Sequence, residues 1–193
     1  MRKTALLEVI AGKNLGINAS DTDKQAILSA IAYLEDLNPT PNPLEASELL
    51  DGNWRLLYTS SSELLNINRI PLANLNKIYQ CIRVKTNSIY NIAEINGLPF
   101  LEGLVCAVAK FETVSRSRVQ VKFERSIIGL QRLLNYKYPG SFIEAIESGK
   151  KFFPIDFPIT SNEQQGWLDI TYLDRDLRIG RGNKGSVFVL TKS

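Results

Sequence analysis

The sequence contains no histidine among its 193 residues. This absence excludes Ser-His-Asp and Cys-His catalytic groups, histidine-ligated zinc or haem, and the side chain that most often acts as a general base near neutral pH. Carboxylates, lysine and tyrosine remain available for catalysis. We nevertheless expect a protein that is not an enzyme and that holds neither a metal ion nor another cofactor.

Cysteine is also scarce, because Cys81 and Cys106 are the only two in the chain. Two cysteines so far apart predict neither a disulfide framework nor a zinc site, and we expect both to lie in strands as small apolar residues. No apolar run reaches the roughly 18 residues that a transmembrane helix needs. The apolar stretch within residues 1–12 is interrupted by Glu8, so we interpret it as a helix rather than a signal peptide.

The charged side chains include no dense block of one sign. The net charge of +3 comes from interspersed lysines, arginines and carboxylates, so we expect no nucleic-acid partner. A hydrophobic fraction of 44% is enough to bury a core, and the length suits one domain with a small appendage.

The spacing of apolar residues changes near Gly52. Before it, residues 1–49 show helical spacing, and Ser20 followed by Asp23 is the signature of a capping box at a helix start. After it, apolar residues alternate along about eight short segments, and no long helices come between them. We therefore predict an antiparallel up-and-down β-barrel over residues 50–193, on which an N-terminal helical segment (1–49) packs.

One later segment departs from strand spacing. Ser141 and Glu144 form a second capping-box pattern, and Gly149 is a stop signal, so we predict a short helix near 141–148. The apolar, proline-bearing stretch 152–159 is interpreted as an irregular edge strand or a flap. Two lysines followed by two phenylalanines, at 150–153, overlap its start, which fits membrane contact, a cover over the barrel mouth, or a solvated loop.

The stretch 179–190 matches the glycine-rich pattern G-x-G-x-x-G-x-V of nucleotide-binding loops. Only eight residues follow Gly185, which leaves no room for the helix and acidic residue, or for the catalytic segments, that such loops require. We therefore expect no bound nucleotide. Residues 182–185 instead predict a turn that needs positive φ, and Gly180 marks a strand position that permits either a bend or the close approach of a bulky neighbour.

Two distant features point to a barrel of the lipocalin-like kind. Gly52-Asn53-Trp54 opens the first expected strand as G-x-W, and Arg178 and Arg181 lie near the last strands. Lipocalin-like barrels pair such a tryptophan with a late arginine that stacks on it, a contact supported by cation–π attraction. The segments LLDGNWRLLYTSS and GWLDITYLDRDLRIGRGNKGSVFVL resemble the two hallmark segments of the plastid lipid-associated protein (PAP/fibrillin) family.

The resemblance, which spans nearly the whole chain, implies a lipocalin-like barrel without catalytic activity. Such a protein binds or organises lipids, carotenoids or quinones at photosynthetic membranes and associates with plastoglobules and thylakoids. The lack of a Ser/Arg-rich transit region favours a cyanobacterial protein, cytoplasmic or peripheral to the thylakoid, or else a plastid protein in its mature form. The alternative is a structural or interaction protein whose barrel is filled and whose outer face and residues 1–49 dock on thylakoid membrane or photosynthetic complexes.

Seven side chains are candidates for contact with an apolar ligand: Trp54, Tyr58, Phe111, Phe123, Tyr172, Arg178 and Arg181. The aromatic ones recur at strand spacing, for which an ordinary core is the plainer interpretation and a pocket wall the alternative. The two arginines are three residues apart and face opposite sides of a strand. We expect one to stack on Trp54, where its charge is available to a ligand carboxylate or headgroup, and the other to meet solvent, Asp174 or Asp176.

Overall fold

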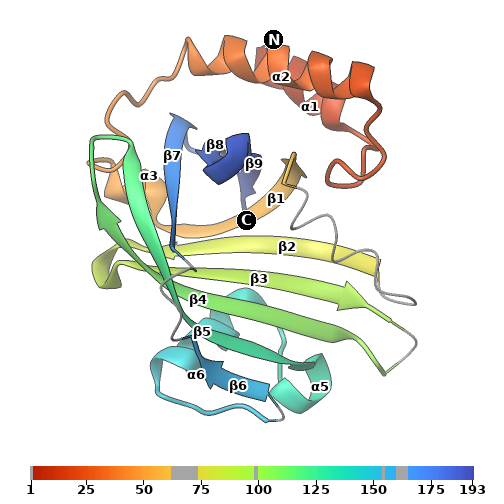
Figure 1. Cartoon of the computed structure of the whole chain (residues 1–193), viewed down its shortest axis with the longest axis vertical. Helices are drawn as coiled ribbons and strands as arrows, with labels where there is room; N and C mark the ends of the chain where they lie inside the picture. Colours follow the sequence, from red (N-terminus) through yellow and green to blue (C-terminus); the bar gives the residue numbers. More distant parts are fainter. Residues whose placement is uncertain (1, 62–73, 98–99, 154, 160–164) are drawn as a thin grey trace.

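The computed structural model describes residues 2–61, 74–97, 100–153, 155–159 and 165–193 (Figure 1). In these ranges the strands are β1 (Gly52–Thr59), β2 (Asn74–Arg83), β3 (Ser88–Asn96), β4 (Gly103–Thr113), β5 (Arg118–Leu130), β6 (Ile155–Pro158), β7 (Gln165–Leu173), β8 (Leu177–Gly182) and β9 (Val187–Lys192). They form one antiparallel sheet in the order β4-β3-β2-β1-β9-β8-β7-β5-β6. Pairing of β4 with β5 closes eight strands into a barrel and leaves β6 as an extra edge strand. The predicted barrel of about eight strands is confirmed.

The described helices are α1 (Arg2–Ile10), α2 (Asp21–Glu35), α3 (Ser47–Leu50), α5 (Gln131–Leu134) and α6 (Pro139–Glu147), with short 3-10 turns η2 (Val84–Thr86) and η3 (Asn183–Gly185). No helix in the described part of the chain is long and apolar enough to cross a membrane. The predicted capping box of α2 is confirmed, because the Ser20 hydroxyl accepts from the Asp23 amide and the Asp23 carboxylate accepts from the Ser20 amide.

The second predicted capping box is wrong, although the short helix itself is present as α6. The helix begins at Pro139, whose fixed φ suits the first helical position. Ser141 therefore lies inside the first turn, where its hydroxyl donates to the carbonyl oxygen of Tyr138 at 3.1 Å.

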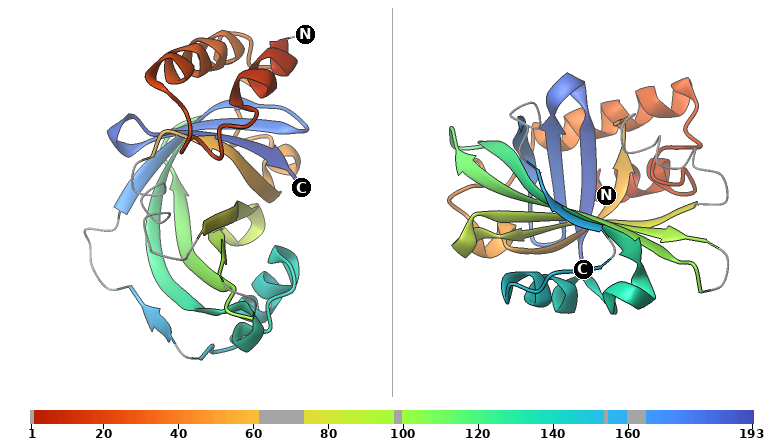
Figure 2. Two further views of the ribbon diagram at one scale, coloured as in Figure 1. Left: turned by 90° about the vertical axis from the view of Figure 1, so that its right-hand side faces the viewer. Right: turned by 60° about the horizontal axis from the view of Figure 1, so that its bottom comes forward.

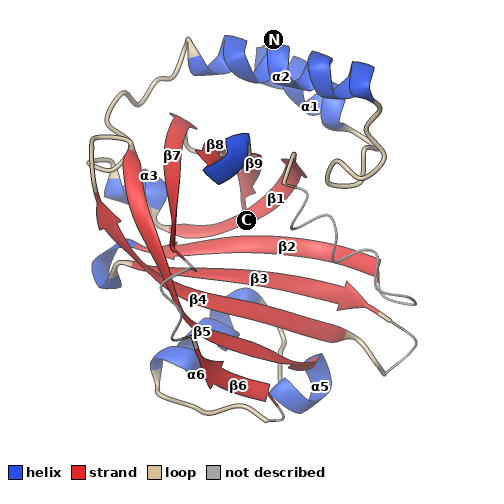
Figure 3. Cartoon of the chain, in the orientation of Figure 1, coloured by secondary structure: helices blue, strands red, loops and turns tan. Residues whose placement is uncertain are grey.

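Helices cover the outside of the barrel at two opposite ends of the molecule (Figures 2 and 3). α1 and α2 lie over β1, β7, β8 and β9, and their apolar side chains are buried against the outer face of these strands. α5 and α6 cover the outer face of β2, β3, β4 and β5 in a separate cluster. A third cluster fills part of the barrel interior and draws residues from seven of the eight barrel strands, all except β8.

Two β-bulges decide which residues face the barrel interior. Trp54 and Leu56 of β1 point inward, but the pairing with β9 shifts register between Leu56 and Tyr58. Tyr58 consequently lies outside, under α1 and α2. A bulge between Ile170 and Tyr172 of β7 moves Tyr172 outside in the same way. Simple alternation, which groups Tyr58 with Trp54, is therefore wrong here.

The glycine-rich stretch forms the hairpin that joins β8 to β9. Gly185 has φ +72°, as the predicted turn requires, whereas Gly182 has φ −120° and is ordinary extended backbone. At Gly180 an added Cβ would lie 3.2 Å from the Leu168 side chain and 3.3 Å from the Asp169 carbonyl oxygen. The close approach predicted at Gly180 is thus confirmed, and its neighbour is β7.

Candidate ligand-binding site

The tryptophan and arginine at opposite ends of the barrel sequence meet inside the barrel. The guanidinium carbon of Arg178 on β8 lies 5.1 Å from the centroid of the Trp54 ring on β1, which is the stacking that the G-x-W pattern predicts. The Lys192 ammonium lies 5.1 Å from the same ring. The Trp54 indole donates to the carbonyl oxygen of Leu50 at 2.9 Å, which ties β1 to the end of α3.

Arg178 is a buried cation with few hydrogen-bond partners. Its side chain is 1% exposed, and its Nη2 donates to Oε1 of Gln80 at 2.7 Å. Its Nε and Nη1 have no hydrogen-bond partner among the described residues. Burial lowers the pKa of Arg178 to about 9, because the interior disfavours the charged form.

Gln80 continues a polar path across the interior from Arg178. Its Nε2 donates to Oδ1 of Asn91 at 3.1 Å, and the two residues are register partners on β2 and β3. Both are half-buried, so the path runs from a fully buried charge toward a more exposed part of the interior. Sequence analysis missed this pair, although a glutamine between inward-facing Ile78 and Ile82 was a detectable signal of a polar group inside the barrel.

The end of the barrel next to Arg178 is filled. The remaining cavity has a volume of about 10 Å³, which holds at most about one water molecule. Leu44 and Leu50, from the segment that precedes β1, close the cavity on one side. Apart from Arg178, its walls are apolar: Leu44, Leu50, Ile82, Ile89, Phe111, Val119, Leu168 and Ile170.

The other end of the interior is more exposed than the outside of the same strands. On β4, the inward-facing Val105 and Ala107 are half-buried, whereas the outward-facing Leu104 and Cys106 are 0% exposed beneath α5 and α6. Ala107 is the register partner of Asn91 on β3. Here the inner wall of the barrel is reachable by solvent and is lined by small or apolar side chains and one amide.

The structure brings together four of the seven predicted site residues. Trp54, Phe111 and Arg178 are buried in the interior, and Phe123 packs half-buried against the same cluster. Tyr58 and Tyr172 lie on the opposite, outer side of the barrel wall. These two tyrosines therefore support the helical cover of the barrel and do not line its interior.

Arg181 also lies outside, on the face of β8 opposite Arg178. Its guanidinium forms a two-pronged ion pair with Glu35 of α2, with N···O distances of 2.8 and 2.7 Å. The predicted alternative of Asp174 or Asp176 as its partner is wrong, because Lys3 of α1 pairs with both of those carboxylates. Arg181 thus fastens α2 to the barrel.

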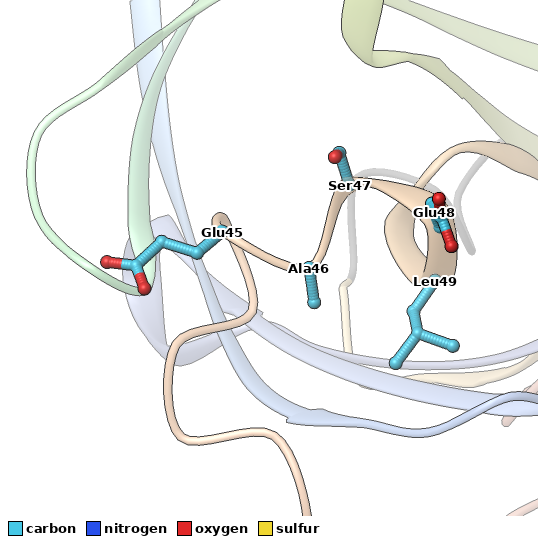
Figure 4. Close-up of a pocket in the computed structure, with 5 residues that line it drawn as sticks. All are labelled: Glu45, Ala46, Ser47, Glu48 and Leu49. Carbon is cyan, nitrogen blue, oxygen red and sulfur yellow. The ribbon is translucent and has the colours of Figure 1, made fainter.

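A second hollow, of about 330 Å³, lies outside the barrel beside α3 (Figure 4). Residues 45–49 line it, all from one continuous segment, so no side chains from separate elements converge on a ligand there. The described residues also include no group of three potential metal ligands. The barrel interior is therefore the candidate site.

A closed antiparallel eight-stranded barrel with an arginine stacked on the tryptophan of its first strand defines a barrel of the lipocalin-like kind. Comparison with known proteins identifies the family more closely. The PAP_fibrillin family model matches residues 1–191, and the chain belongs to this family.

Relatives come from several plants. The chain is 37% identical over 217 residues to a light-induced chloroplastic protein of Solanum demissum, covering 98% of the chain and 66% of that relative. It is 34% identical to a chromoplast-specific carotenoid-associated protein of Cucumis sativus (98% and 67%) and 34% identical to plastoglobulin-1 of Pisum sativum (98% and 60%). The chain thus spans about two-thirds or less of the length of these proteins. No solved structure matches the chain.

Proposed function

We propose that this protein binds a hydrophobic small molecule or lipid in the half-exposed end of its barrel. The observation that carries the proposal is the reversed burial along β4, where the inward-facing Val105 and Ala107 are more exposed than the outward-facing Leu104 and Cys106. Covering a solvent-exposed apolar wall with an apolar molecule lowers the free energy, because both apolar surfaces leave water. The name of the carotenoid-associated relative supports the same class of ligand.

We also infer that the role is not enzymatic. Burial raises the pKa of both thiols, Cys81 and Cys106, to about 12, so neither supplies a thiolate nucleophile near neutral pH. The polar path described above inside the barrel consists of Arg178, Gln80 and Asn91, and none of these three is a general base at neutral pH. These groups suit positioning of a ligand.

A second function, contact with a lipid surface, is favoured by the end of the molecule that carries α5, α6 and β6 (Figure 1). Seven large apolar side chains are exposed there: Phe100, Leu101, Leu133, Tyr138, Phe153, Ile155 and Phe157. The most exposed are Phe153, at 80%, and Phe100, at 74%. Exposed basic residues lie among them, at Arg132, Lys137 and Lys150. Aromatic and basic side chains together suit the interface of an anionic membrane.

This placement differs from docking through the helical segment 1–49. The apolar stripe of α2, which includes Ile27, Ile31 and Leu34, is already buried against the barrel. The most exposed large apolar side chains, Phe153 at 80% and Phe100 at 74%, lie at the opposite end of the molecule, whereas Leu7 on α1 is 39% exposed. We propose a peripheral position at the thylakoid or a plastid lipid particle, supported by the chloroplastic and chromoplastic relatives.

The ligand proposal is tested by filling the barrel. Ala107→Phe places a ring in the half-exposed interior and is expected to weaken binding of an apolar probe by roughly tenfold or more. Ala26→Phe, at an exposed position on α2, is the matched control and is expected to bind as the wild type does. Binding is followed by intrinsic tryptophan fluorescence, and bound molecules are identified by solvent extraction and mass spectrometry. Equal affinity in both variants contradicts the site.

The lipid-surface proposal is tested by flotation with vesicles that contain an anionic lipid. Replacing Phe153 and Phe157 together by serine is expected to reduce the membrane-bound fraction severalfold. Replacing Leu7 and Tyr33, which are exposed on α1 and α2, by serine is the control and is expected to change little. If the control lowers flotation as much, the lipid contact is not at the α5–α6 end.

A further inference from the structure

The charge of Arg178 is not neutralised by any side chain in the described part of the chain. The seven ion pairs found there do not include it, and they join six other basic side chains to carboxylates: Lys3, Lys13, Lys24, Arg118, Arg125 and Arg181. Its hydrogen-bond acceptor is the neutral amide of Gln80. The nearest other charge over the Trp54 ring is a second cation, Lys192. Asp51 acts electrostatically on Lys192 but not on Arg178, so Arg178 is the cation of this pair that has no carboxylate partner.

The contact of Arg178 with Trp54 leaves most N–H donors of the guanidinium without an acceptor. Stacking engages the face of the group, whereas its five N–H donors lie in its plane. Gln80 takes one hydrogen of Nη2, while Nε and Nη1 have no acceptor among the described residues. Two edges of a guanidinium accept a carboxylate, Nε with Nη2 and Nη1 with Nη2, so one bond from Nη2 leaves one edge complete.

Gln80 and Asn91 connect the Arg178 guanidinium to the half-exposed end of the barrel. Asn91 lies opposite Ala107 on the inner wall, and Gln80 lies between Asn91 and Arg178. A head group that reaches Gln80 from that end meets the guanidinium next, once the glutamine side chain turns aside. The apolar body of the same molecule then lies against Val105 and Ala107.

From this arrangement we propose that Arg178 anchors a carboxylate head, so that the ligand is an amphiphile with one carboxylate and a long apolar body. The inference rests on the proposed function and specifies its ligand class. Burial of the paired charges strengthens their attraction, because little solvent remains to screen it. Gln80 and Asn91 are positioning residues that offer amide donors to the second carboxylate oxygen.

The test compares three probes in a Trp167→Phe background, where Trp54 is the single remaining tryptophan. Palmitate is expected to bind roughly tenfold or more tightly than hexadecanol, which has the same chain without the charge, and to change the Trp54 emission. Acetate is expected not to bind. Arg178→Met is expected to abolish the preference for palmitate, whereas Arg181→Met, which removes the outer arginine, is expected to retain it.

Each other outcome is decisive. Equal affinity for palmitate and hexadecanol overturns the carboxylate anchor but leaves the proposed function standing. Binding of acetate as tight as that of palmitate overturns the amphiphile and indicates a small-anion site. Failure of every apolar probe, charged or neutral, overturns the proposed function itself.

A second measurement does not depend on the folding of Arg178→Met. Palmitate labelled with ¹³C at its carboxyl carbon is titrated with acid while bound to the wild-type protein. A carboxylate paired with a buried arginine is expected to stay ionised to lower pH than free palmitate. A bound carboxyl that titrates at or above the pH of the free acid overturns the anchor.

Discussion

The two faces of β4 have opposite environments at the same height in the barrel. Outward-facing Leu104 and Cys106 are fully buried under α5 and α6, whereas inward-facing Val105 and Ala107 are half-buried. In a barrel whose interior is filled throughout, the side chains on the inner face are less exposed to solvent than those on the outer face. On this part of the wall the apolar core therefore lies outside the barrel, under α5 and α6, and the inner face stays partly exposed.

The inner wall is not open along its whole length. At the Trp54 end, side chains from the barrel strands and the segment before β1 leave a cavity of only about 10 Å³. The filled end holds the strands together and fixes the buried Arg178. At the other end Val105 and Ala107 are only half-buried, so we expect their side chains to contribute less to stability.

Trp54→Ala tests the filled end and has the largest expected effect. Removing a fully buried indole that packs against Arg178 and donates to Leu50 is expected to lower the free energy of unfolding by about 3–5 kcal/mol. The measurement is chemical denaturation followed by circular dichroism. A loss below about 1 kcal/mol means that this end of the barrel is not packed as described.

Two neighbouring truncations test the contrast on β4 directly. Leu104→Ala, on the covered outer face, is expected to lower the free energy of unfolding by about 2–5 kcal/mol. Val105→Ala, on the half-exposed inner face, is expected to cost under about 1 kcal/mol, since less apolar surface returns to water. The same denaturation experiment measures both. Equal losses remove the distinction between the two faces.

Acidification is expected to destabilise the α5–α6 cover on the outer face of the barrel, and this is the smallest of the expected effects. Arg125 donates to both oxygens of Asp156 at 2.8 and 2.7 Å, and the Phe152 amide donates to the same carboxylate, which lowers the pKa of Asp156. A carboxyl whose folded pKa is depressed contributes stability above its unfolded pKa of about 3.9 and loses it as the pH falls through the folded pKa.

Asp156→Asn removes that contribution and serves as the comparison. Denaturation at pH 6 and at successively lower pH values is expected to show a smaller acid-induced loss in the variant than in the wild type. Phe152 packs on Phe142 of α6. As the pH falls, we therefore expect the signals of these phenylalanines to change before those of the tryptophans. Identical pH profiles for the two proteins exclude a role for Asp156 in holding the cover.

Much of the barrel was predictable, because strand pleating alone places Val105, Ala107 and Phe111 on one face. The positions of Tyr58 and Tyr172 were not, since a bulge changes the face of a residue without changing the apolar pattern.

Long-range partners set a second limit on prediction from sequence. Arg181 and Glu35 are 146 positions apart, and no local rule pairs them. The stacking of Arg178 on Trp54 was accessible only through resemblance to a known family, because spacing alone showed that the two arginines differ in face but not which one is inside.

The reversed burial on β4 is tested most directly by methyl NMR during titration with an apolar ligand. Leu104 and Val105 are adjacent in sequence and face opposite sides of the wall, so each is the control for the other. Saturation with palmitate is expected to shift the methyl signals of Val105 strongly and those of Leu104 little. Larger shifts at Leu104, or none at either residue, would contradict a ligand inside the barrel.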